Sequence, residues 1–274
     1  MHSNFSIIVN TTDSFEDCWL PFFKLFKKYW PEYSGRIYLN TETKEFKYEE
    51  LNIISVKSGL INQPWSECLQ YAINQIEGEY FIYMQEDYFL NNKVNHKSIT
   101  ELYELFENNK FDCLHLTDQC TKGPFDISTV NKNLWEIKKG ADYRVSTQAA
   151  FWRKGSILEI IRPWESGWDF EKFGTIRSCK STNKIMCVNQ NAYQKDINEL
   201  IPYVFTGIIK GKWKQEVVPL FKENQIEIVY KNRGLVEKKD GVRVLSKVNT
   251  FINVVLKYLK NYLLEINYQK KSKK

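Results

Sequence analysis

The sequence contains little glycine, proline, cysteine or histidine. Its 274 residues include 12 glycines and 7 prolines, too few for a collagen-like or low-complexity chain. The six cysteines form no CxxC pair and the three histidines are far apart, which argues against a zinc site of Cys and His. We see no apolar run long enough to span a membrane and no signal peptide. We therefore expect a cytoplasmic protein with reduced, mostly buried thiols, in which any metal has oxygen ligands.

Apolar residues, in contrast, are abundant. Hydrophobic residues make up 43% of the chain and aromatic residues 15%, enough to bury a sizeable core and to exclude a disordered chain. We find no linker rich in Pro, Gly or Ser and no internal repeat. We therefore expect one domain over residues 1–245, followed by a tail over residues 246–274.

The net charge of +6 comes from the tail. Residues 246–274 contain seven lysines and one acid, Glu265, so the first 245 residues balance at 32 basic and 32 acidic side chains. A body without excess positive charge has no general attraction for a polyanion. We therefore expect no nucleic-acid partner.

The tail also carries an apolar stripe. Its apolar residues recur at steps of three and four, which predicts an amphipathic helix. They are Phe251, Val254, Val255, Tyr258, Leu259, Tyr262, Leu263 and Ile266. Two interpretations stay open: the helix docks on its own domain, or it lies on an anionic membrane surface with its lysines near the headgroups. The second would make the protein peripheral on the inner face of the cell membrane.

Strand and helix patterns alternate along the first half. We predict strands at residues 5–9, 36–39, 53–56, 80–84 and 113–116, and helices at 14–29, 64–76 and 98–108. In the second half we predict strands at 134–137, 147–152, 204–209 and 226–229, and a helix at 156–161. This alternation indicates an α/β fold with a mainly parallel sheet covered on both faces. We divide this domain into a nucleotide-type first half, residues 1–118, and a substrate-type second half, residues 119–245, which are not two separate domains.

Acidic residues follow two of the predicted strands. Asp13 follows the first strand, and the pair Glu86 and Asp87 follows the strand at 80–84. Ligands of open parallel sheets bind beyond the carboxyl ends of the strands. Adjacent carboxylates suit Mg²⁺ or Mn²⁺, so Asp87 and Glu86 are candidate metal ligands. The alternative is a pair of solvated loop acids.

A series of residues leads into this acidic pair. Ala72, Asn74, Gly78 and Tyr80 precede Glu86-Asp87, and the series resembles the core of GT-A glycosyltransferases. Within that fold it resembles the family-2-like bacterial enzymes of surface-polysaccharide synthesis. There, a helix with an Ala-x-Asn pattern leads through a Gly-x-Tyr strand into the metal-binding signature. The resemblance covers residues 5–90, with a looser similarity to about residue 215. It implies a GT-A fold, a Rossmann-like and mainly parallel central sheet flanked by helices.

The resemblance departs at the signature itself. The family's pattern is Asp-x-Asp, whereas this chain has Gln85-Glu86-Asp87-Tyr88. Three alternatives follow for the cation: Asp87 alone holds it, the protein holds it weakly, or the protein does not bind it.

The resemblance further implies a nucleotide-sugar donor, most simply a UDP-sugar. Its base and ribose would lie near two short stretches, whose candidate residues are Thr11, Thr12, Asp13, Gln63, Trp65 and Ser66. Asp87 would reach the diphosphate through Mn²⁺ or Mg²⁺. Lys210 and Lys212 are candidate donors to the same diphosphate, because the leaving group needs positive charge; alternatively they are ordinary surface lysines.

The stretch from residue 162 to 174 contains three carboxylates among aromatic residues. Glu165, Asp169 and Glu171 are candidate bases, because an apolar wall raises a carboxylate pKa toward the range useful for deprotonating a sugar hydroxyl. Ser166 and Asp169 also fit a capping box, which would give Asp169 a structural role. We favour Glu171 or Asp169 as the base. Gln148, on the preceding strand, either faces the sugar or is a paired polar group.

Together these features predict an inverting glycosyltransferase. It would move a sugar from a nucleotide diphosphate to a lipid-linked saccharide acceptor. We expect this reaction to belong to bacterial surface polysaccharide synthesis. The alternative is a non-catalytic nucleotide- or saccharide-binding scaffold with a degenerate GT-A fold. A dehydrogenase or methyltransferase is disfavoured because no GxGxxG motif follows the first strand.

Overall fold

The computed structural model describes residues 5–237 and 247–271. The chain divides into two compact units, Met1–Val236 and Glu237–Lys274. The boundary that we expected at residues 245 and 246 falls between the described segments.

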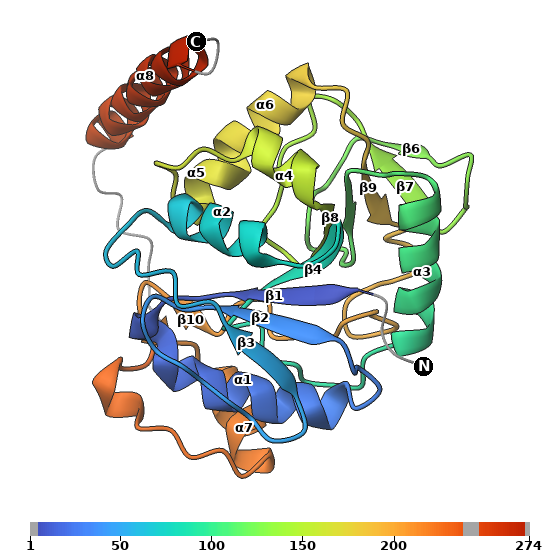
Figure 1. The fold of residues 1–274 in the computed structure, drawn as a ribbon, viewed down its shortest axis with the longest axis vertical. Helices are drawn as coiled ribbons and strands as arrows, with labels where there is room; N and C mark the ends of the chain where they lie inside the picture. The colour runs from blue at the N-terminus through green and yellow to red at the C-terminus, as the bar shows by residue number, and fades with distance from the viewer. Residues whose placement is uncertain (1–4, 238–246, 272–274) are drawn as a thin grey trace. The chain divides into compact units, whose positions relative to one another are not determined.

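The first unit is built on a nine-stranded sheet with the order β3-β2-β1-β4-β8-β5-β9-β7-β6 (Figure 1). The strands are β1 Ser6–Asn10, β2 Arg36–Asn40, β3 Asn52–Ser55, β4 Tyr80–Gln85, β5 Cys113–His115, β6 Phe125–Ile127, β7 Leu134–Ile137, β8 Ala150–Arg153 and β9 Ile185–Val188. β1 pairs in parallel with β2 and β4, whereas β8 runs antiparallel between β4 and β5. All strands except β7 and β8 run in one direction, which confirms the mainly parallel α/β sheet.

Helices cover both faces of this sheet (Figure 1). They are α1 Glu16–Tyr29, α2 Trp65–Gln75, α3 His96–Asn108, α4 Lys154–Ile160, α5 Gly167–Asp169, α6 Thr175–Lys180 and α7 Val217–Glu223. The short elements are the 3-10 turns η1 Asp13–Phe15 and η3 Tyr230–Asn232, the π-helical turn η2 Phe170–Gly174, and the hairpin of β10 Ile208–Ile209 with β11 Lys212–Trp213.

Alternation along the strands separates two hydrophobic cores. Ile7 of β1 points into the core shared by α1, α3 and α7, and its neighbour Ile8 points into the core shared by α2 and α4. Successive strand side chains face opposite sides of a sheet, so a strand buried on both faces is apolar throughout. The six cysteines are free, and only Cys179 is not fully buried, as expected.

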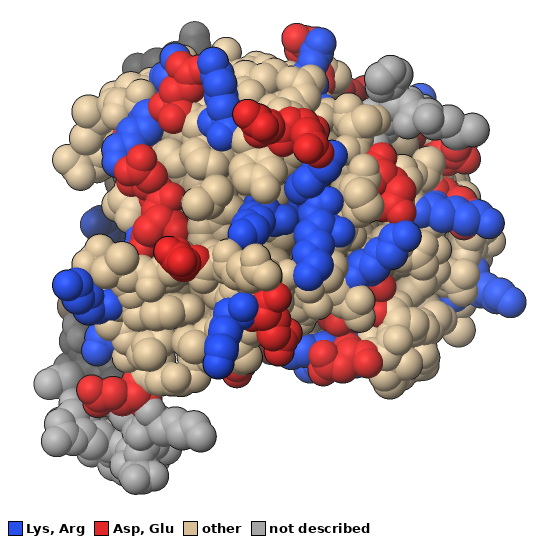
Figure 2. Space-filling view, turned by 90° about the horizontal axis from the view of Figure 1, so that it is seen from below, with Lys and Arg blue, Asp and Glu red and all other residues tan. Residues whose placement is uncertain are grey.

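The late part of the first unit differs from the prediction. Of the strand expected at 204–209, only Ile208–Ile209 forms, and the strand expected at 226–229 is absent from this described segment. Residues near 203 instead run beside residues near 90, with a single bridge between Leu90 and Tyr203. β6, β9, α6 and α7 were not predicted. Acidic and basic side chains are interspersed over the face of the molecule in Figure 2.

The second unit contains the helix α8, Lys247–Lys271. Among its described side chains, Leu259 is 54% exposed and Leu263 60% exposed, on the stripe predicted from the sequence. The side chains of Phe251, Val254 and Val255 lie outside the described set. Within the described residues, no helix combines the length and apolar character needed to cross a bilayer.

Candidate functional site

The carboxyl ends of β1, β2 and β4 meet at one edge of the sheet, and buried polar residues gather there. The Asn40 side-chain amide donates a hydrogen bond to Asn10 Oδ1 at 2.7 Å, which links the ends of β2 and β1. Thr11 is 5% exposed, and its hydroxyl accepts a hydrogen bond from Trp19 Nε1 at 2.9 Å. Buried polar groups in proteins are normally hydrogen-bonded, and these side chains are hydrogen-bonded to one another. This edge of the sheet therefore has an ordered polar surface.

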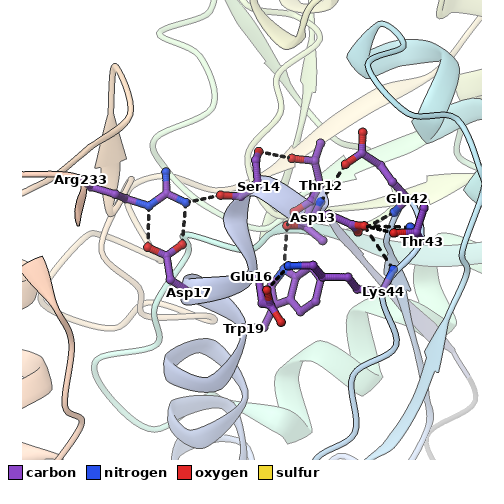
Figure 3. Close-up of polar contacts among 11 residues, drawn as sticks. Thr12, Asp13, Ser14, Glu16, Asp17, Trp19, Glu42, Thr43, Lys44 and Arg233 are labelled. Atoms are coloured by element: carbon purple, nitrogen blue, oxygen red, sulfur yellow. Dashed lines mark hydrogen bonds and ion pairs between the residues drawn. The ribbon is translucent and has the colours of Figure 1, made fainter.

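Asp13 connects the loops that follow β1 and β2 (Figure 3). Its Oδ1 accepts a hydrogen bond from the Glu42 amide at 2.9 Å. Its Oδ2 accepts hydrogen bonds from the Thr43 amide and hydroxyl and from the Lys44 amide. Burial acts to raise the pKa of Asp13, but these hydrogen bonds outweigh it and lower the pKa. Because both oxygens are already engaged, Asp13 holds the loop in place. The hydroxyl of its half-exposed neighbour Thr12 lies 2.7 Å from that of Ser14.

Glu86 and Asp87 follow β4 directly, and each is 7% exposed. Three donors of the segment 206–208 reach Asp87 Oδ2: the Thr206 hydroxyl at 2.6 Å and two backbone amides at 3.1 Å each. Burial raises the pKa of Asp87, and these hydrogen bonds oppose the rise. All three hydrogen bonds from the segment 206–208 end on Oδ2, and the backbone of Asp87 itself also donates to the carboxylate. No other described residue donates to Oδ1.

Glu86 is in a different environment. Within residues 5–237 its carboxylate forms no ion pair, and the hydrogen bond that acts to lower its pKa comes from its own backbone. Burial raises its pKa well above the ordinary value, and the charge of Asp87 raises it further. A carboxylate in this position is stabilised by a nearby positive charge, which can come from a cation.

The segment 206–208 approaches Asp87 closely because residue 207 is glycine. A Cβ atom at Gly207 would lie 2.3 Å from the ring of Phe89 and 3.0 Å from the carbonyl oxygen of Asp87. The Gly207 amide donates to that carbonyl oxygen at 3.0 Å. The glycine therefore permits the contact that fixes the Asp87 side chain.

Arg233 is a residue of this edge that sequence reasoning missed. Its guanidinium makes two hydrogen bonds to the carboxylate of Asp17 in α1, at 2.6 and 2.5 Å, and one to the carbonyl of Ser14 (Figure 3). It also lies 4.5 Å from the ring centroid of Phe15, and its charge opposes the rise in the pKa of Glu86. No local pattern marks this arginine, because its partners are more than 200 positions away.

The side chains at this edge supply only part of the ligands that a divalent cation needs. No group of three His, Cys, Asp or Glu side chains in the described residues could hold a metal. Mg²⁺ and Mn²⁺ sites at phosphates, however, commonly use one or two carboxylates together with phosphate oxygens and water. Asp87 Oδ1 and the Glu86 carboxylate supply that number of ligands, so the residues fit a cation that arrives with a diphosphate.

Glu171 lies in a hydrogen-bonded network that reaches the acidic pair. Its Oε1 accepts hydrogen bonds from the Thr147 amide and hydroxyl, both at 2.8 Å. The carbonyl of Thr147 in turn accepts one from the Tyr88 hydroxyl at 2.9 Å, and Tyr88 follows Asp87 directly. No described hydrogen bond ends on Oε2 of Glu171. The structure thus connects one of the three predicted bases to the loop after β4.

The other two predicted bases have structural partners. Glu165 is fully buried, and both of its oxygens contact Arg177, at 2.7 and 2.6 Å. Burial raises its pKa, and the arginine opposes the rise. Asp169 forms the predicted capping box with Ser166 at the start of α5. These placements do not support Glu165 or Asp169 as the base, because their carboxylates stabilise the fold.

The remaining predicted residues are spread around the edge. Trp65 begins α2, and its ring lies 5.8 Å from that of Phe170. Ser66 is buried and donates its amide to the Glu165 carbonyl at 3.1 Å, whereas Gln63 is exposed.

Gln148 is paired, because it contacts the hydroxyls of Tyr88 and Tyr203. Lys210 and Lys212 are exposed on the β10–β11 hairpin, directly after the segment that holds Asp87. The hairpin thus places two free positive charges along the same stretch of chain.

Comparisons with known proteins find similarity in structure only. No protein-family model matches the sequence, and no curated protein matches it. A crystal structure of S. aureus TarS 1–349 is 19% identical with a TM-score of 0.43, over 68% of this chain and 58% of that chain. UDP-glucose pyrophosphorylase complexed with UDP-glucose is 10% identical with a TM-score of 0.43, over 69% of this chain and 90% of that chain. The chain thus spans little more than half of TarS 1–349. Similarity at this level concerns the layout of strands and helices and does not extend to a site.

Proposed function

We propose that this chain is a glycosyltransferase that moves a sugar from a UDP-sugar to a saccharide acceptor. One observation carries the proposal. Hydrogen bonds of 2.8 to 2.9 Å join Glu171 to Thr147 and Thr147 to Tyr88, which is the chain neighbour of Asp87. No donor from another described residue reaches Oε2 of Glu171 or Oδ1 of Asp87. A pair of carboxylates at the carboxyl edge of a parallel sheet can serve a leaving group and a nucleophile at once.

Glu171 acts in this proposal as the general base. An acceptor hydroxyl oxygen bonds to the anomeric carbon while the bond from that carbon to the diphosphate breaks. The hydroxyl proton goes to Oε2 of Glu171, and Thr147 holds Oε1 in place. A single displacement with one base inverts the configuration at the anomeric carbon.

Negative charge develops on the departing diphosphate and needs fixed positive charge nearby. A Mn²⁺ or Mg²⁺ ion held by Asp87 Oδ1 and Glu86 would supply that charge. Lys210 and Lys212 lie on the hairpin beyond the segment 206–208, where they can add to it. Thr11, Thr12 and the start of α2 remain the proposed contacts of the nucleotide.

The acceptor is proposed to be lipid-linked, as in bacterial surface polysaccharide synthesis. The exposed apolar side chains of α8, flanked by lysines, are suited to the surface of an anionic membrane. Such a helix would keep a cytoplasmic, peripheral enzyme near a substrate that cannot leave the bilayer.

Titration of UDP with and without Mn²⁺ tests the proposal. We expect binding that requires Mn²⁺ and is weakened at least tenfold by Asp87→Asn. The matched control is Asp126→Asn, on the outermost strand β6, which should bind like the wild type. Glu171→Gln should keep UDP binding and lose transfer by a factor of about 10² or more. Absence of UDP binding under all conditions would instead favour the non-catalytic scaffold.

A further inference from the structure

A cavity of about 340 Å³ lies beside the site, and no role has yet been assigned to it. Its walls are the segment 203–205, the helix α7 with the residues before it, Asn91, and residues 195–196. The volume is within the range of small-molecule pockets in proteins.

The cavity shares a wall with the site. Phe205 lines it and directly precedes Thr206, whose hydroxyl holds Asp87 at 2.6 Å. Tyr203 also lines it, and its ring stacks on that of Tyr88 with the centroids 4.8 Å apart. A ligand in the cavity would therefore lie within one or two residues of the groups that orient Asp87.

The surface of the cavity combines an aromatic face with unused polar groups. Phe205 is 37% exposed, so part of its ring is available for stacking. Asn91, Asp196 and Glu223 line the cavity, and their side chains make no hydrogen bond or ion pair with any described residue. Apolar ring faces beside hydrogen-bonding side chains suit a ligand with both C–H faces and hydroxyl groups.

The charge of the cavity narrows the class of ligand. Its lining includes the carboxylates of Asp196 and Glu223 and the ammonium of Lys195, and a third carboxylate, that of Glu216, which forms an ion pair with Lys214 at 2.6 Å. An excess of carboxylates repels a diphosphate or a uronic acid. The nucleotide of the donor is therefore excluded, and an uncharged hydroxyl-rich ligand remains.

We propose that this cavity is a subsite for an uncharged saccharide, which holds the units of the acceptor next to the reacting unit. The identification as an acceptor subsite rests on the proposed glycosyl transfer. The binding of an uncharged sugar does not, because it follows from the cavity alone.

Saturation-transfer NMR without nucleotide tests the subsite. The probes are the methyl glycosides of glucose, galactose and N-acetylglucosamine, with methyl glucuronide as the charged counterpart of methyl glucoside. We expect a saturation-transfer signal from at least one uncharged glycoside and a signal at least threefold weaker from the glucuronide. In Phe205→Ala the signal should be lost. Glu223→Ala, at the exposed rim, should weaken it as well, and the matched control Glu227→Ala, outside the lining, should not.

No signal from any uncharged glycoside, or a signal that survives both Phe205→Ala and Glu223→Ala, would overturn the subsite. Kinetics then separates this inference from the proposed function. With a saccharide acceptor, Glu223→Ala should raise the acceptor KM at least fivefold and leave the donor KM unchanged. Sugar binding in the cavity without any transfer would refute the enzyme and leave the binding site standing.

Discussion

The close approach of residue 207 to Asp87 makes Gly207→Ala a sharp test of the site. The new Cβ atom would lie 2.3 and 2.6 Å from two ring carbons of Phe89, well inside van der Waals contact. Phe89 cannot yield easily. Its ring is fully buried between Trp213 and Phe221, with centroids 6.0 and 4.9 Å away. The segment 206–208 must therefore move away from Asp87.

The cost can be worked from these contacts. Overpacking of a filled core costs about 1–3 kcal/mol, and weaker hydrogen bonds at the Gly207 amide add about 1 kcal/mol. We expect a loss of about 2–4 kcal/mol in the free energy of unfolding, which for a domain of this size lowers Tm by roughly 4–16 °C. UDP binding in the presence of Mn²⁺ should weaken too, because Asp87 loses donors that orient it.

Thermal unfolding and UDP titration of the variant check both effects. The matched control is Gly155→Ala in α4, where an added Cβ meets no atom within 4 Å. That change should stabilise the helix by about 0.5–1 kcal/mol, as alanine does relative to glycine within helices. A Gly207→Ala protein with the Tm and UDP affinity of the wild type would refute the packing of this segment on Phe89 and Asp87.

Three further predictions concern other parts of the molecule. Arg177→Met removes the ion-pair partner of the buried Glu165 carboxylate and leaves it the amide and the charge of Arg162, which should cost about 3 kcal/mol in urea unfolding; adding Glu165→Gln should recover most of it, and a loss below about 1 kcal/mol would show that the pair is unimportant. Burial lowers the pKa of His115 from 6.5 to about 4, so the unfolded state binds its proton more readily and stability falls as the pH drops through this range. Between pH 7 and pH 4 the wild type should therefore lose about 3 kcal/mol more than His115→Phe, and equal losses would contradict this. Truncation after Leu245 should abolish binding to anionic liposomes while UDP-sugar hydrolysis persists; unchanged sedimentation with the liposomes would rule out the membrane role of the tail.

Local patterns in the sequence predicted the features that depend on near neighbours. Apolar runs located β1, β2, β4 and β5 because a strand buried on both faces shows its burial in consecutive residues. The spacing of Ser166 and Asp169 predicted the capping box, since both of its partners lie within one helical turn. The same reasoning placed the acidic pair at the carboxyl end of β4, which the structure confirms.

Long-range contacts decided what each carboxylate does, and the sequence carried no signal for them. Asp87 meets Thr206 across 119 positions, and Arg233 meets Asp17 across 216. Among three carboxylates within seven residues, only the fold showed that Glu165 is paired with an arginine and that Glu171 faces Thr147.

The sequence by itself therefore determined where strands, caps and acids lie along the chain, because those depend on periodicity and on groups a few residues apart. Only the tertiary structure decided which carboxylates have both oxygens occupied by partners within the protein and which keep an oxygen that no other described residue contacts. That depends on which distant segment the sheet order, with β8 reversed between β4 and β5, brings against each of them.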